Sequence, residues 1–501
     1  MKTQLRTLLC LALFLGGISA CAENEPGTTG EETTAEGGST PEEFVAVFDV
    51  TSLFDMADLE DAGKLNLELK KDVVQLHDGG LAWMVPFAYR SGYFLSPWDH
   101  PSVLYVPLEL NPARAGTVAI VQQGTDDLEP GLNVDEEFGL QTALALGVPV
   151  AVIGKLPHST YFSPIQSLFG IADDLPQCFE TPLVGSLLMW CSDQISVKSE
   201  NTKFSWSVHL AIARAWMRSI TAIGELPSRL AEFEDKPVPA FTVERAVMGG
   251  ASTRAEALWL AAALDPRIAG LWLAASDRVN WHRFYERMRD SWGSWLPEDP
   301  GTQLTLLETE FGAIWRTLRD PIAFMDLVSE IDLAIIRGTH DGLAPVGAIH
   351  GYLDELPDDA TYQMLPSVGH GMATEAHLSS WRAFVKRVAD EEPSARPVAT
   401  FEWGEEDTVE VSVRIPENVT VDSSAAVLHV TSVHAVADDP DLRDAKWVDF
   451  PLLAQGVDED GMRLWIGTFS PQPDHWAAFV EVSGFGTGVT TAPHLSWESE
   501  N

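Results

Sequence analysis

The chain has 501 residues, of which 45% are hydrophobic and 21% charged, as in ordinary globular proteins. Its 74 acidic and 32 basic residues give a formal net charge of −42, which repels phosphate backbones and removes nucleic acid from the expected partners. Four cysteines without a CxxC pair argue against a thiolate metal site or a disulfide framework. We expect neither a metal nor a cofactor.

Residues 1–20 have the pattern of a bacterial secretory signal, with basic residues, then a short apolar run, then small residues. The small residues stop at Cys21, as in a lipobox, where the cysteine receives a diacylglyceryl group. An ordinary signal with a chance cysteine is the alternative. Because Ala22 follows, and not Asp, we expect an exported protein at the outer membrane of a Gram-negative bacterium, on its periplasmic or surface side. The lipid is its only expected membrane contact.

Residues 21–43 are rich in Gly, Thr, Glu and Pro and have almost nothing to bury, which predicts a flexible acidic tether. Two cysteines remain in the following part of the chain, Cys178 and Cys191. An exported protein meets an oxidising compartment, so we expect these two to form a disulfide. Two separate buried thiols are the alternative.

Between residues 44 and 395, short apolar runs alternate with longer helical patterns. The expected strands are Leu81–Phe87, Val103–Leu108, Thr117–Gln122, Val148–Ile153, Arg245–Met248, Ile268–Ala274, Leu333–Arg337 and Thr361–Leu365. The expected helices are Trp206–Ile223, Thr253–Leu264 and Leu378–Val388. Because several strands are apolar on both faces and helices separate them, the pattern predicts an α/β fold with a doubly wound, mostly parallel sheet.

The pattern changes after the linker-like EEPSARP segment. Residues 396–501 contain short alternating runs such as Val409–Ile415 and Ala425–Val433, with turn residues between them and no long amphipathic helix. This pattern predicts a small antiparallel β-domain of sandwich type.

The segment from Val243 to Ala275 carries the strongest chemical signal. A strand leads into Gly250 and Ser252, and an apolar helix starts immediately afterwards. This is the context of a nucleophile elbow, where a strained turn exposes the serine hydroxyl. The common elbow pattern has glycine where this chain has Arg254, and a helix N-cap is the alternative role for Ser252.

Two further residues complete a possible triad in the order serine, acid, histidine. Asp341 follows the expected strand Leu333–Arg337, and His370 lies between glycines after the next strand. His370 would take the proton of Ser252, and Asp341 would orient the imidazole. A turn residue and an ordinary loop histidine are the alternatives for Asp341 and His370.

The remaining roles leave several candidates. The backbone N–H of Thr253 is one expected oxyanion donor, and the loop with Gly124 and Thr125 should supply the other. Asp277 competes with Asp341 as the acid.

Three more histidines are candidates for the base or the pocket. His340 is adjacent to Asp341 and would replace His370 only if the loop were turned inside out. His377 lies close to the next helix and is expected at the surface. His158 follows the strand that ends at Ile153 and is a candidate pocket residue.

Together these features resemble the PhoPQ-activated pathogenicity-related protein family, a divergent group within the α/β-hydrolase superfamily. The residues that carry the resemblance are Gly250, Ser252 and Arg254, Asp265-Pro266-Arg267, Asn280, Asp320-Pro321, the GTHD segment ending in Asp341, Gly369-His370, and segments 155–158 and 441–447. It extends over roughly residues 44–493. It implies an α/β-hydrolase-like sheet with a cap insertion, and accounts for the arginine of the elbow.

Asn280 and Trp281, in the expected cap segment, are candidate pocket residues. The neighbouring Asp277 is a further candidate. Trp292 and Trp295 lie in the same segment, and core packing of the cap is the alternative role for the tryptophans. We therefore expect a lipid-anchored serine hydrolase that acts on an ester or amide bond of a small-molecule or peptide substrate. The alternative is a non-catalytic surface lipoprotein that keeps the scaffold for binding.

Overall fold

The computed structural model describes the chain in twelve stretches. These are residues 49–92, 98–122, 134–156, 208–292, 300–372, 374–404, 408–419, 426–433, 442–443, 445–470, 475–484 and 487–495. Every described residue belongs to one compact unit, Val45–Asn501. The expectations for the signal, Cys21, the tether, Gly124, Thr125, His158, Cys178, Cys191 and Trp295 lie outside the described residues.

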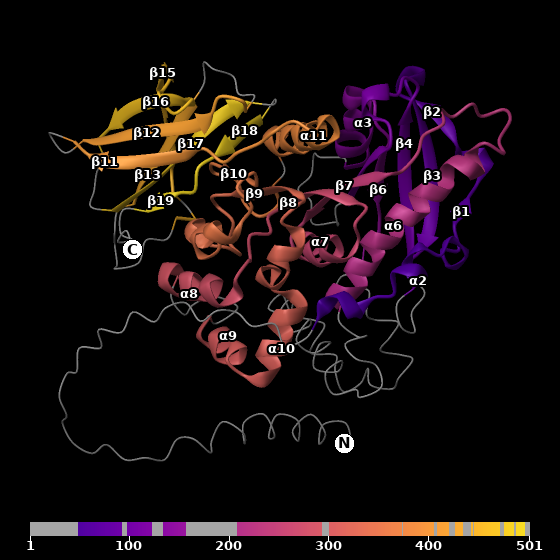
Figure 1. Cartoon of the computed structure of the whole chain (residues 1–501), viewed down its shortest axis with the longest axis horizontal. Coiled ribbons are helices and arrows are strands. Elements are labelled where there is room, and N and C mark those ends of the chain that lie inside the picture. The colour runs from indigo at the N-terminus through magenta and orange to yellow at the C-terminus, as the bar shows by residue number, and fades with distance from the viewer. Residues whose placement is uncertain are drawn as a thin grey trace, which may run out of the picture. The chain divides into compact units, whose positions relative to one another are not determined.

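A ten-stranded sheet forms the larger part of the described structure (Figure 1). Its strands are β1 Glu68–Leu69, β2 Gln75–His77, β3 Ala82–Arg90, β4 Asp99–Pro107, β5 Thr117–Gln122, β6 Val150–Ile153, β7 Arg245–Ala251, β8 Ile268–Ala274, β9 Asp332–Gly338 and β10 Thr361–Leu365. They lie in the order β1-β3-β4-β6-β5-β7-β8-β9-β10, and β2 pairs with β3. The first strands pair antiparallel, and β5 to β10 pair parallel.

The helices of this part connect and cover the strands. They are α2 Met56–Glu60, α3 Gln141–Leu146 after the π-helical η7 Val134–Leu140, α6 Val208–Leu230, α7 Thr253–Leu264, α8 Trp281–Trp292, α9 Pro300–Leu307, α10 Glu310–Arg319, the 3₁₀ segments η10 Pro321–Val328 and η11 Val346–Gly351, and α11 Glu375–Asp390. Three expected strands and the elbow helix have the bounds predicted from sequence. Helix α6 continues beyond its expected end at Ile223, through Pro227.

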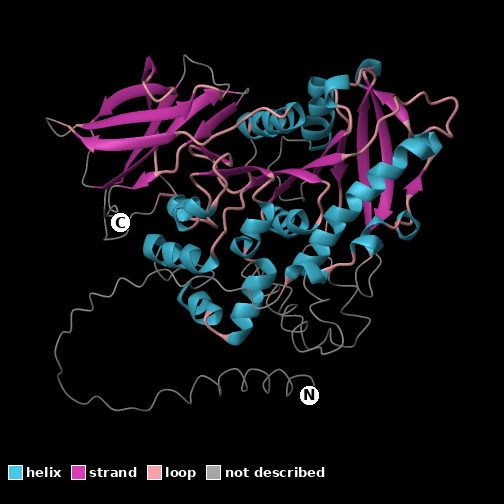
Figure 2. Ribbon diagram, viewed as in Figure 1, coloured by secondary structure: helices cyan, strands magenta, loops and turns pink. Residues whose placement is uncertain are grey.

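Two apolar layers lie on opposite faces of the sheet. Helices α6 and α7 pack on one face with Trp216 and Trp259 in the core, and α3 and α11 pack on the other with Trp272 and Trp381 (Figures 1 and 2). The parallel strands are therefore buried on both faces, which is why they read as continuous apolar runs. The doubly wound α/β fold expected from the sequence is confirmed.

The winding of the chain reverses around β5. From β5 the chain moves to β6 on one side and returns past β5 to β7, β8, β9 and β10 on the other. A reversal of this kind opens a crevice at the carboxyl ends of the neighbouring strands, where ligands bind in open α/β sheets. Both the elbow strand β7 and the strand β5 end at this place.

Helices α8, α9 and α10 form an insertion between β8 and β9. The insertion has its own apolar cluster, in which Trp281, Phe284, Tyr285 and Trp292 are buried. This is the expected cap. Trp281 and Trp292 pack in its core, which is the alternative to a pocket role for these tryptophans.

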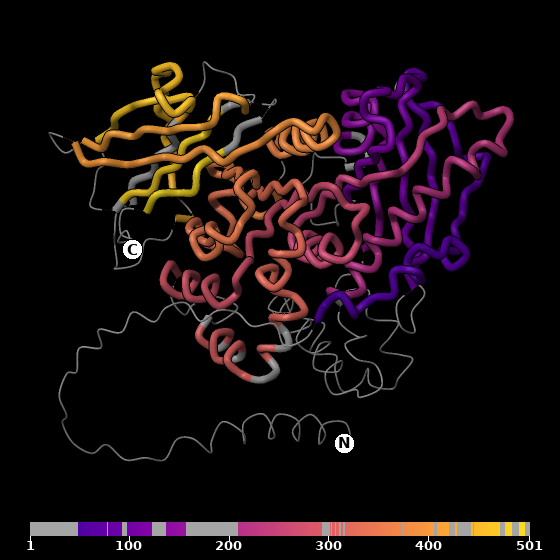
Figure 3. Tube along the Cα trace, in the orientation of Figure 1, coloured from indigo at the N-terminus to yellow at the C-terminus, as the bar shows by residue number. Residues whose placement is uncertain are grey.

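The C-terminal part consists of two antiparallel sheets (Figure 2). One contains β11 Val398–Trp403, β12 Val409–Pro416, β16 Met462–Phe469 and β15 Leu453–Val457, and the other contains β14 Val448–Pro451, β13 Ala426–Val433, β17 His475–Gly484, β18 Thr487–Thr490 and β19 His494–Leu495. Residues 391–397 connect α11 to β11 (Figure 3). The small antiparallel region is confirmed.

Strand β17 connects the two parts through its alternating side chains. Ala478 and Val480 face the core between the two small sheets, whereas Ala477 and Phe479 belong to the core of the α/β part. Beside it, β18 covers the edge strand β10, where Met364 N donates to Thr490 Oγ1 at 3.0 Å. No helix among the described residues is long and apolar enough to cross a membrane.

Candidate active site

Ser252 lies on a strained turn between β7 and α7. Its backbone has φ 54° and ψ −138°, a conformation that non-glycine residues rarely adopt. Its N–H donates to Ala274 O at 2.9 Å, and its side chain makes no capping hydrogen bond with α7. Ser252 therefore occupies the N-cap position of α7 without capping the helix through its side chain, and the hydroxyl stays available to another partner.

The glycines before Ser252 let helices approach the strand closely. A Cβ on Gly250 would lie 3.1 Å from Leu258 and 3.2 Å from the backbone of Ala255, and one on Gly249 would lie 2.7 Å from the Trp381 ring. The crowding on the helix side involves the backbone of residue 255, and Arg254 is helical, with its carbonyl accepting from Trp216 Nε1 at 3.1 Å. The elbow therefore forms without the second glycine of the common pattern.

The structure brings Ser252, His370 and Asp341 together. His370 Nδ1 lies 3.0 and 2.9 Å from the two carboxylate oxygens of Asp341, and its Nε2 lies 3.1 Å from Ser252 Oγ. Because the carboxylate can only accept, Nδ1–H donates to it, and Nε2 accepts from the serine hydroxyl. The three groups form one continuous hydrogen-bonded chain.

Asp341 and His370 each favour the charged form of the other. Burial favours the neutral form of Asp341, yet the hydrogen bond and charge of His370 and the charge of Arg337 lower its pKa below the ordinary value. Burial also opposes the charged form of His370, but the hydrogen bond and charge of Asp341 outweigh it and raise the pKa above 6.5. Asp341 thus stays ionised and makes His370 a stronger base.

Asp277 has a different partner from the one an acid of the triad needs. Its carboxylate accepts from Arg337 Nη1 at 2.5 Å, and both side chains are buried. Arg337 also donates to Pro345 O and Ala344 O, both at 2.6 Å. The pair therefore ties the end of β8 to the loop that carries Asp341, and Asp277 is a support of this loop and not the partner of His370.

His340 and His377 are also placed clear of the base position. His340 Nε2 donates to the C-terminal region at Ala445 O, 2.8 Å away. His377 was expected at the surface, and this expectation is wrong. Its ring is buried, stacked on Trp272 at 4.7 Å, and burial lowers its pKa to about 3. His377 lies on the buried face of α11, where its flat ring packs in the core.

Asn280 and Trp281 tie the start of α8 to η11 and to the residue between α10 and η10. Asn280 has a positive φ of 53°, and its amide donates to Gly351 O at 3.1 Å. Trp281 is fully buried, and its N–H donates to Asp320 Oδ2 at 2.6 Å. Burial raises the pKa of Asp320 to about 7 although backbone N–H groups lower it. These candidate pocket residues therefore hold the start of α8.

Thr253 provides the one expected oxyanion donor within the described residues. It is the first residue of α7, where backbone N–H groups have no partner inside the helix. The helix dipole adds positive potential at this end. An oxyanion formed beside Ser252 would meet this N–H.

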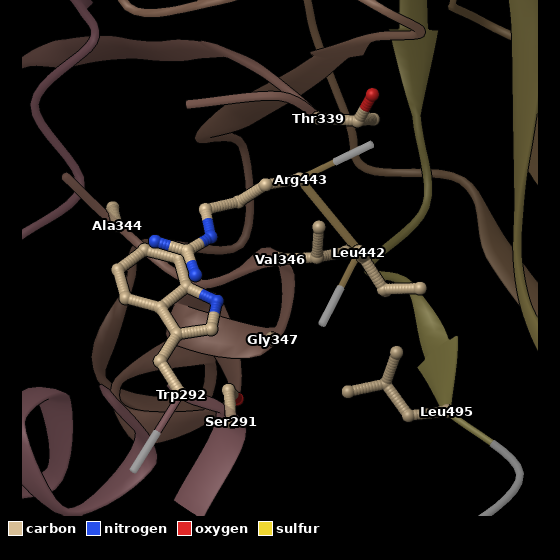
Figure 4. A pocket seen from close by; sticks show the side chains of 9 residues that line it. All are labelled: Ser291, Trp292, Thr339, Ala344, Val346, Gly347, Leu442, Arg443 and Leu495. Atoms are coloured by element: carbon tan, nitrogen blue, oxygen red, sulfur yellow. The ribbon is translucent and has the colours of Figure 1, made fainter. Parts of the chain in front are cut away.

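A small cavity lies next to the acid loop, between α8 and the C-terminal region (Figure 4). The guanidinium of Arg443 lies over the Trp292 ring at 4.6 Å from its centroid. The residues that line the cavity are Ser291, Trp292, Thr339, Ala344, Val346, Gly347, Leu442, Arg443 and Leu495. They include neither Ser252 nor His370. Within the described ranges, no group of three or more His, Cys, Asp and Glu side chains is placed to hold a metal ion.

Sequence reasoning missed Arg337 and the role of Asp320. A signal for Arg337 existed, because a charged residue in the otherwise apolar run IDLAIIRG needs a buried partner. Asp320 was noted only as part of an Asp-Pro pair. Its bond to Trp281 spans 39 positions, and no local pattern indicates it.

A serine elbow after a central parallel strand, followed in the chain by an acid and a histidine, defines an α/β-hydrolase-type scaffold. The chain belongs to the PhoPQ-activated pathogenicity-related protein family, whose model matches residues 89–443. The match covers more than half of the chain and is narrower than the span of 44–493 expected from the sequence.

The chain is also similar to several esterases of known structure. It is similar to a glucuronoyl esterase from Solibacter usitatus, with 16% identity over 65% of this chain and 86% of that chain and a TM-score of 0.38. It is similar to acetyl xylan esterase 1 from Thermoanaerobacterium sp. JW/SL YS485, with 12% identity over 67% of this chain and 93% of that chain and a TM-score of 0.36. It is also similar to an acetyl xylan esterase from Paenibacillus sp. R4, with 14% identity over 69% of this chain and 96% of that chain and a TM-score of 0.38. No curated protein matches the sequence.

Proposed function

We propose that this protein is a serine hydrolase that cleaves an ester or amide bond through an acyl-enzyme. The observation that carries the proposal is the continuous hydrogen-bonded chain from Asp341 through His370 to Ser252, on a strained elbow. A nucleophile and its base need a separation of about 2.6–3.2 Å, and Ser252 Oγ lies 3.1 Å from His370 Nε2. The family and the α/β-hydrolase-type scaffold agree with this chemistry.

In the proposed reaction, Ser252 Oγ attacks the carbonyl carbon while its proton moves to His370 Nε2. The negative charge on the carbonyl oxygen is stabilised by the N–H of Thr253 at the start of α7. The tetrahedral species collapses when its bond to the leaving group breaks, and His370 returns the proton to that group. Water then repeats both steps and releases the acid, with Asp341 ionised throughout.

The alternative function is a non-catalytic lipoprotein that uses the scaffold for binding. A separation between Ser252 Oγ and His370 that is too long for proton transfer would favour this alternative. The 3.1 Å separation and the ionised Asp341 behind His370 speak against this alternative. The substrate proposed here is a small molecule or a peptide with an ester or amide bond.

Labelling with a fluorophosphonate probe tests the proposal, because the probe reacts with activated serines. We expect wild-type protein to be labelled and Ser252→Ala to lose labelling completely. Ser276→Ala is the matched control, since Ser276 is buried nearby and its hydroxyl has no hydrogen-bond partner among the described residues. It should be labelled like wild type. Unlabelled wild-type protein, or labelling of Ser252→Ala, would contradict the proposal.

We also propose that the protein is exported and anchored by a lipid on Cys21. The support is the sequence pattern of residues 1–20 and the polar stretch 21–43. Metabolic labelling with a palmitate analogue and fractionation of membranes test this. Wild-type protein should incorporate the label and remain with the outer membrane, and Cys21→Ser should do neither. A Cys10→Ser control, inside the signal, should behave like wild type. Unlabelled wild-type protein would contradict the anchor.

A further inference from the structure

Arg278 lies beside the candidate triad, in the loop that leaves β8. Strand β8 is the neighbour of the elbow strand β7, and Ala274 pairs with Ala251, the residue before Ser252. Arg278 therefore leaves the sheet at the same carboxyl edge as the nucleophile. Its side chain is 17% exposed, so it is partly covered but in reach of solvent.

Phe284, Tyr285 and Glu256 are among the residues that hold the Arg278 guanidinium in place. Its carbon lies 5.5 Å from the centre of the Phe284 ring, and its Nη1 donates to Tyr285 Oη at 3.4 Å. Both rings belong to α8 of the cap. On the other side, Nε lies 3.6 Å from the carboxylate of Glu256. The cation is thus held between the cap and the elbow helix.

Glu256 connects this cation to the nucleophile. It lies one helical turn after Ser252, and its N–H donates to Ser252 O at 3.1 Å. Its carboxylate makes a shorter contact with the buried Arg319, at 3.0 Å. Two guanidinium groups therefore share this one carboxylate directly behind the elbow.

The charge of Arg278 also acts on the proposed base. It lowers the pKa of His370, against the raising effect of Asp341 and Asp277. The positive charge that disfavours a second cation at the imidazole would attract an anionic group on a bound substrate, and Arg278 lies at the same carboxyl edge of the sheet as Ser252. An arginine carries five N–H donors in a planar fork, so it can keep structural partners and still bind a carboxylate oxygen.

We propose that the site selects substrates that carry a carboxylate near the scissile carbonyl, with Arg278 as the residue that binds it. This inference deepens the proposed function and rests on it. In a chain of net charge −42 the long-range field opposes an anionic substrate. A fixed arginine beside the nucleophile supplies the local attraction that such a substrate needs.

Two pairs of rigid esters, followed in a pH-stat, test the proposal. The first pair is 4-acetoxybenzoate and the neutral 4-acetoxybenzamide, which places the carboxylate on the leaving group. The second pair is monomethyl terephthalate and methyl 4-carbamoylbenzoate, which places it on the acyl group. For the wild-type protein we expect kcat/KM to favour the anionic member of at least one pair, by about tenfold or more, the factor that one charge-assisted hydrogen bond contributes.

Variants separate recognition from simple packing. Arg278→Gln should abolish the preference for the anionic member, and Arg278→Lys should retain part of it. Arg283→Gln is the matched control, because Arg283 lies on α8 with a side chain that is 39% exposed and pairs with Glu286. It should keep the wild-type preference. Thermal unfolding of each variant shows whether its fold is intact.

The outcomes distinguish this inference from the proposed function. A wild-type protein that is labelled by the fluorophosphonate probe and prefers neither anionic ester overturns the inference alone. The same holds if Arg278→Gln lowers kcat/KM for both members of a pair equally, as expected for a purely structural arginine. A protein that is neither labelled nor active on any of the four esters overturns both.

Discussion

Ser252 has a side chain and yet adopts a positive φ, a combination that is rare in proteins. A positive φ in a residue with a Cβ costs about 1–3 kcal/mol and persists only where surrounding structure imposes it. Here the ladder between β7 and β8 fixes the residue before Ser252, and α7 starts directly after it. The strain directs the hydroxyl toward His370 instead of the helix end.

The same residues predict how activity depends on pH. The base must be neutral, and Asp341 raises the pKa of His370 above its ordinary 6.5 although burial and Arg278 lower it and Asp277 adds to the rise. We therefore expect kcat/KM to increase with pH through a midpoint above 6.5. A pH profile on a neutral ester measures this midpoint. A midpoint below 6.5 would contradict the assigned pair.

Asp341→Asn checks the cause of that midpoint. Without the carboxylate, the pKa of His370 should fall, so the midpoint moves to lower pH. The maximal rate should drop by about 10²- to 10⁴-fold, because the imidazole loses its orienting partner. Asp358→Asn, at an exposed position, is the control and should keep both the midpoint and the rate. An unchanged midpoint in Asp341→Asn would assign the acid role elsewhere.

At the scale of elements, the distance between β7 and the helices on both its faces determines whether the elbow forms. Gly249 faces Trp381 of α11, and Gly250 faces Leu258 of α7. The ring of Trp381 is held in place, since its Nε1 donates to Phe138 O at 3.2 Å. Because Gly249 and Gly250 have no side chains, α11 and α7 can pack closely on the two faces of β7.

Gly249→Ala is therefore expected to destabilise the fold. The new Cβ would lie 2.7 Å from a Trp381 ring carbon, and overpacking of this kind costs about 1–3 kcal/mol. Thermal or urea unfolding measures the loss. Gly342→Ala is the control, because no atom lies within 4 Å of its added Cβ. Equal stability of the two variants would show that α11 can move away from the strand.

At the scale of the whole molecule, the C-terminal region completes the core of the α/β part. Phe479 and Trp447 pack at 5.0 Å within that core, and Thr490 supplies hydrogen bonds to the edge strand β10. An uncovered edge strand is a site of aggregation. We therefore propose that the region from residue 396 onward is a separate sheet pair in architecture but part of one folding unit.

A chain truncated after residue 395 tests this. We expect it to aggregate or to lack fixed tertiary packing, measured by size-exclusion chromatography and near-ultraviolet circular dichroism. In the full chain, Phe479→Ala should cost about 3–5 kcal/mol of unfolding free energy, and Val457→Ala, at an exposed position, should cost little. A truncated chain that folds and reacts with the probe at Ser252 would contradict the proposal.

Local patterns were sufficient for much of the architecture. Strands buried on both faces are recognisable by unbroken apolar runs, as β5, β8 and β10 show, and the elbow helix follows from its small and apolar residues. Surface and core histidines have no such pattern. His377 was therefore misplaced, because its burial depends on Trp272 and Phe138, which lie far from it in the sequence.

The net charge, the order of strands and helices, and the order of Ser252, Asp341 and His370 along the chain were determined by the sequence alone. Only the tertiary structure decided that Asp277 pairs with Arg337 and leaves Asp341 to His370. It also decided that Arg278 and Glu256 meet behind the elbow. Periodicity records which residues are buried, whereas the partner of a buried charge depends on which strands become neighbours in the folded sheet.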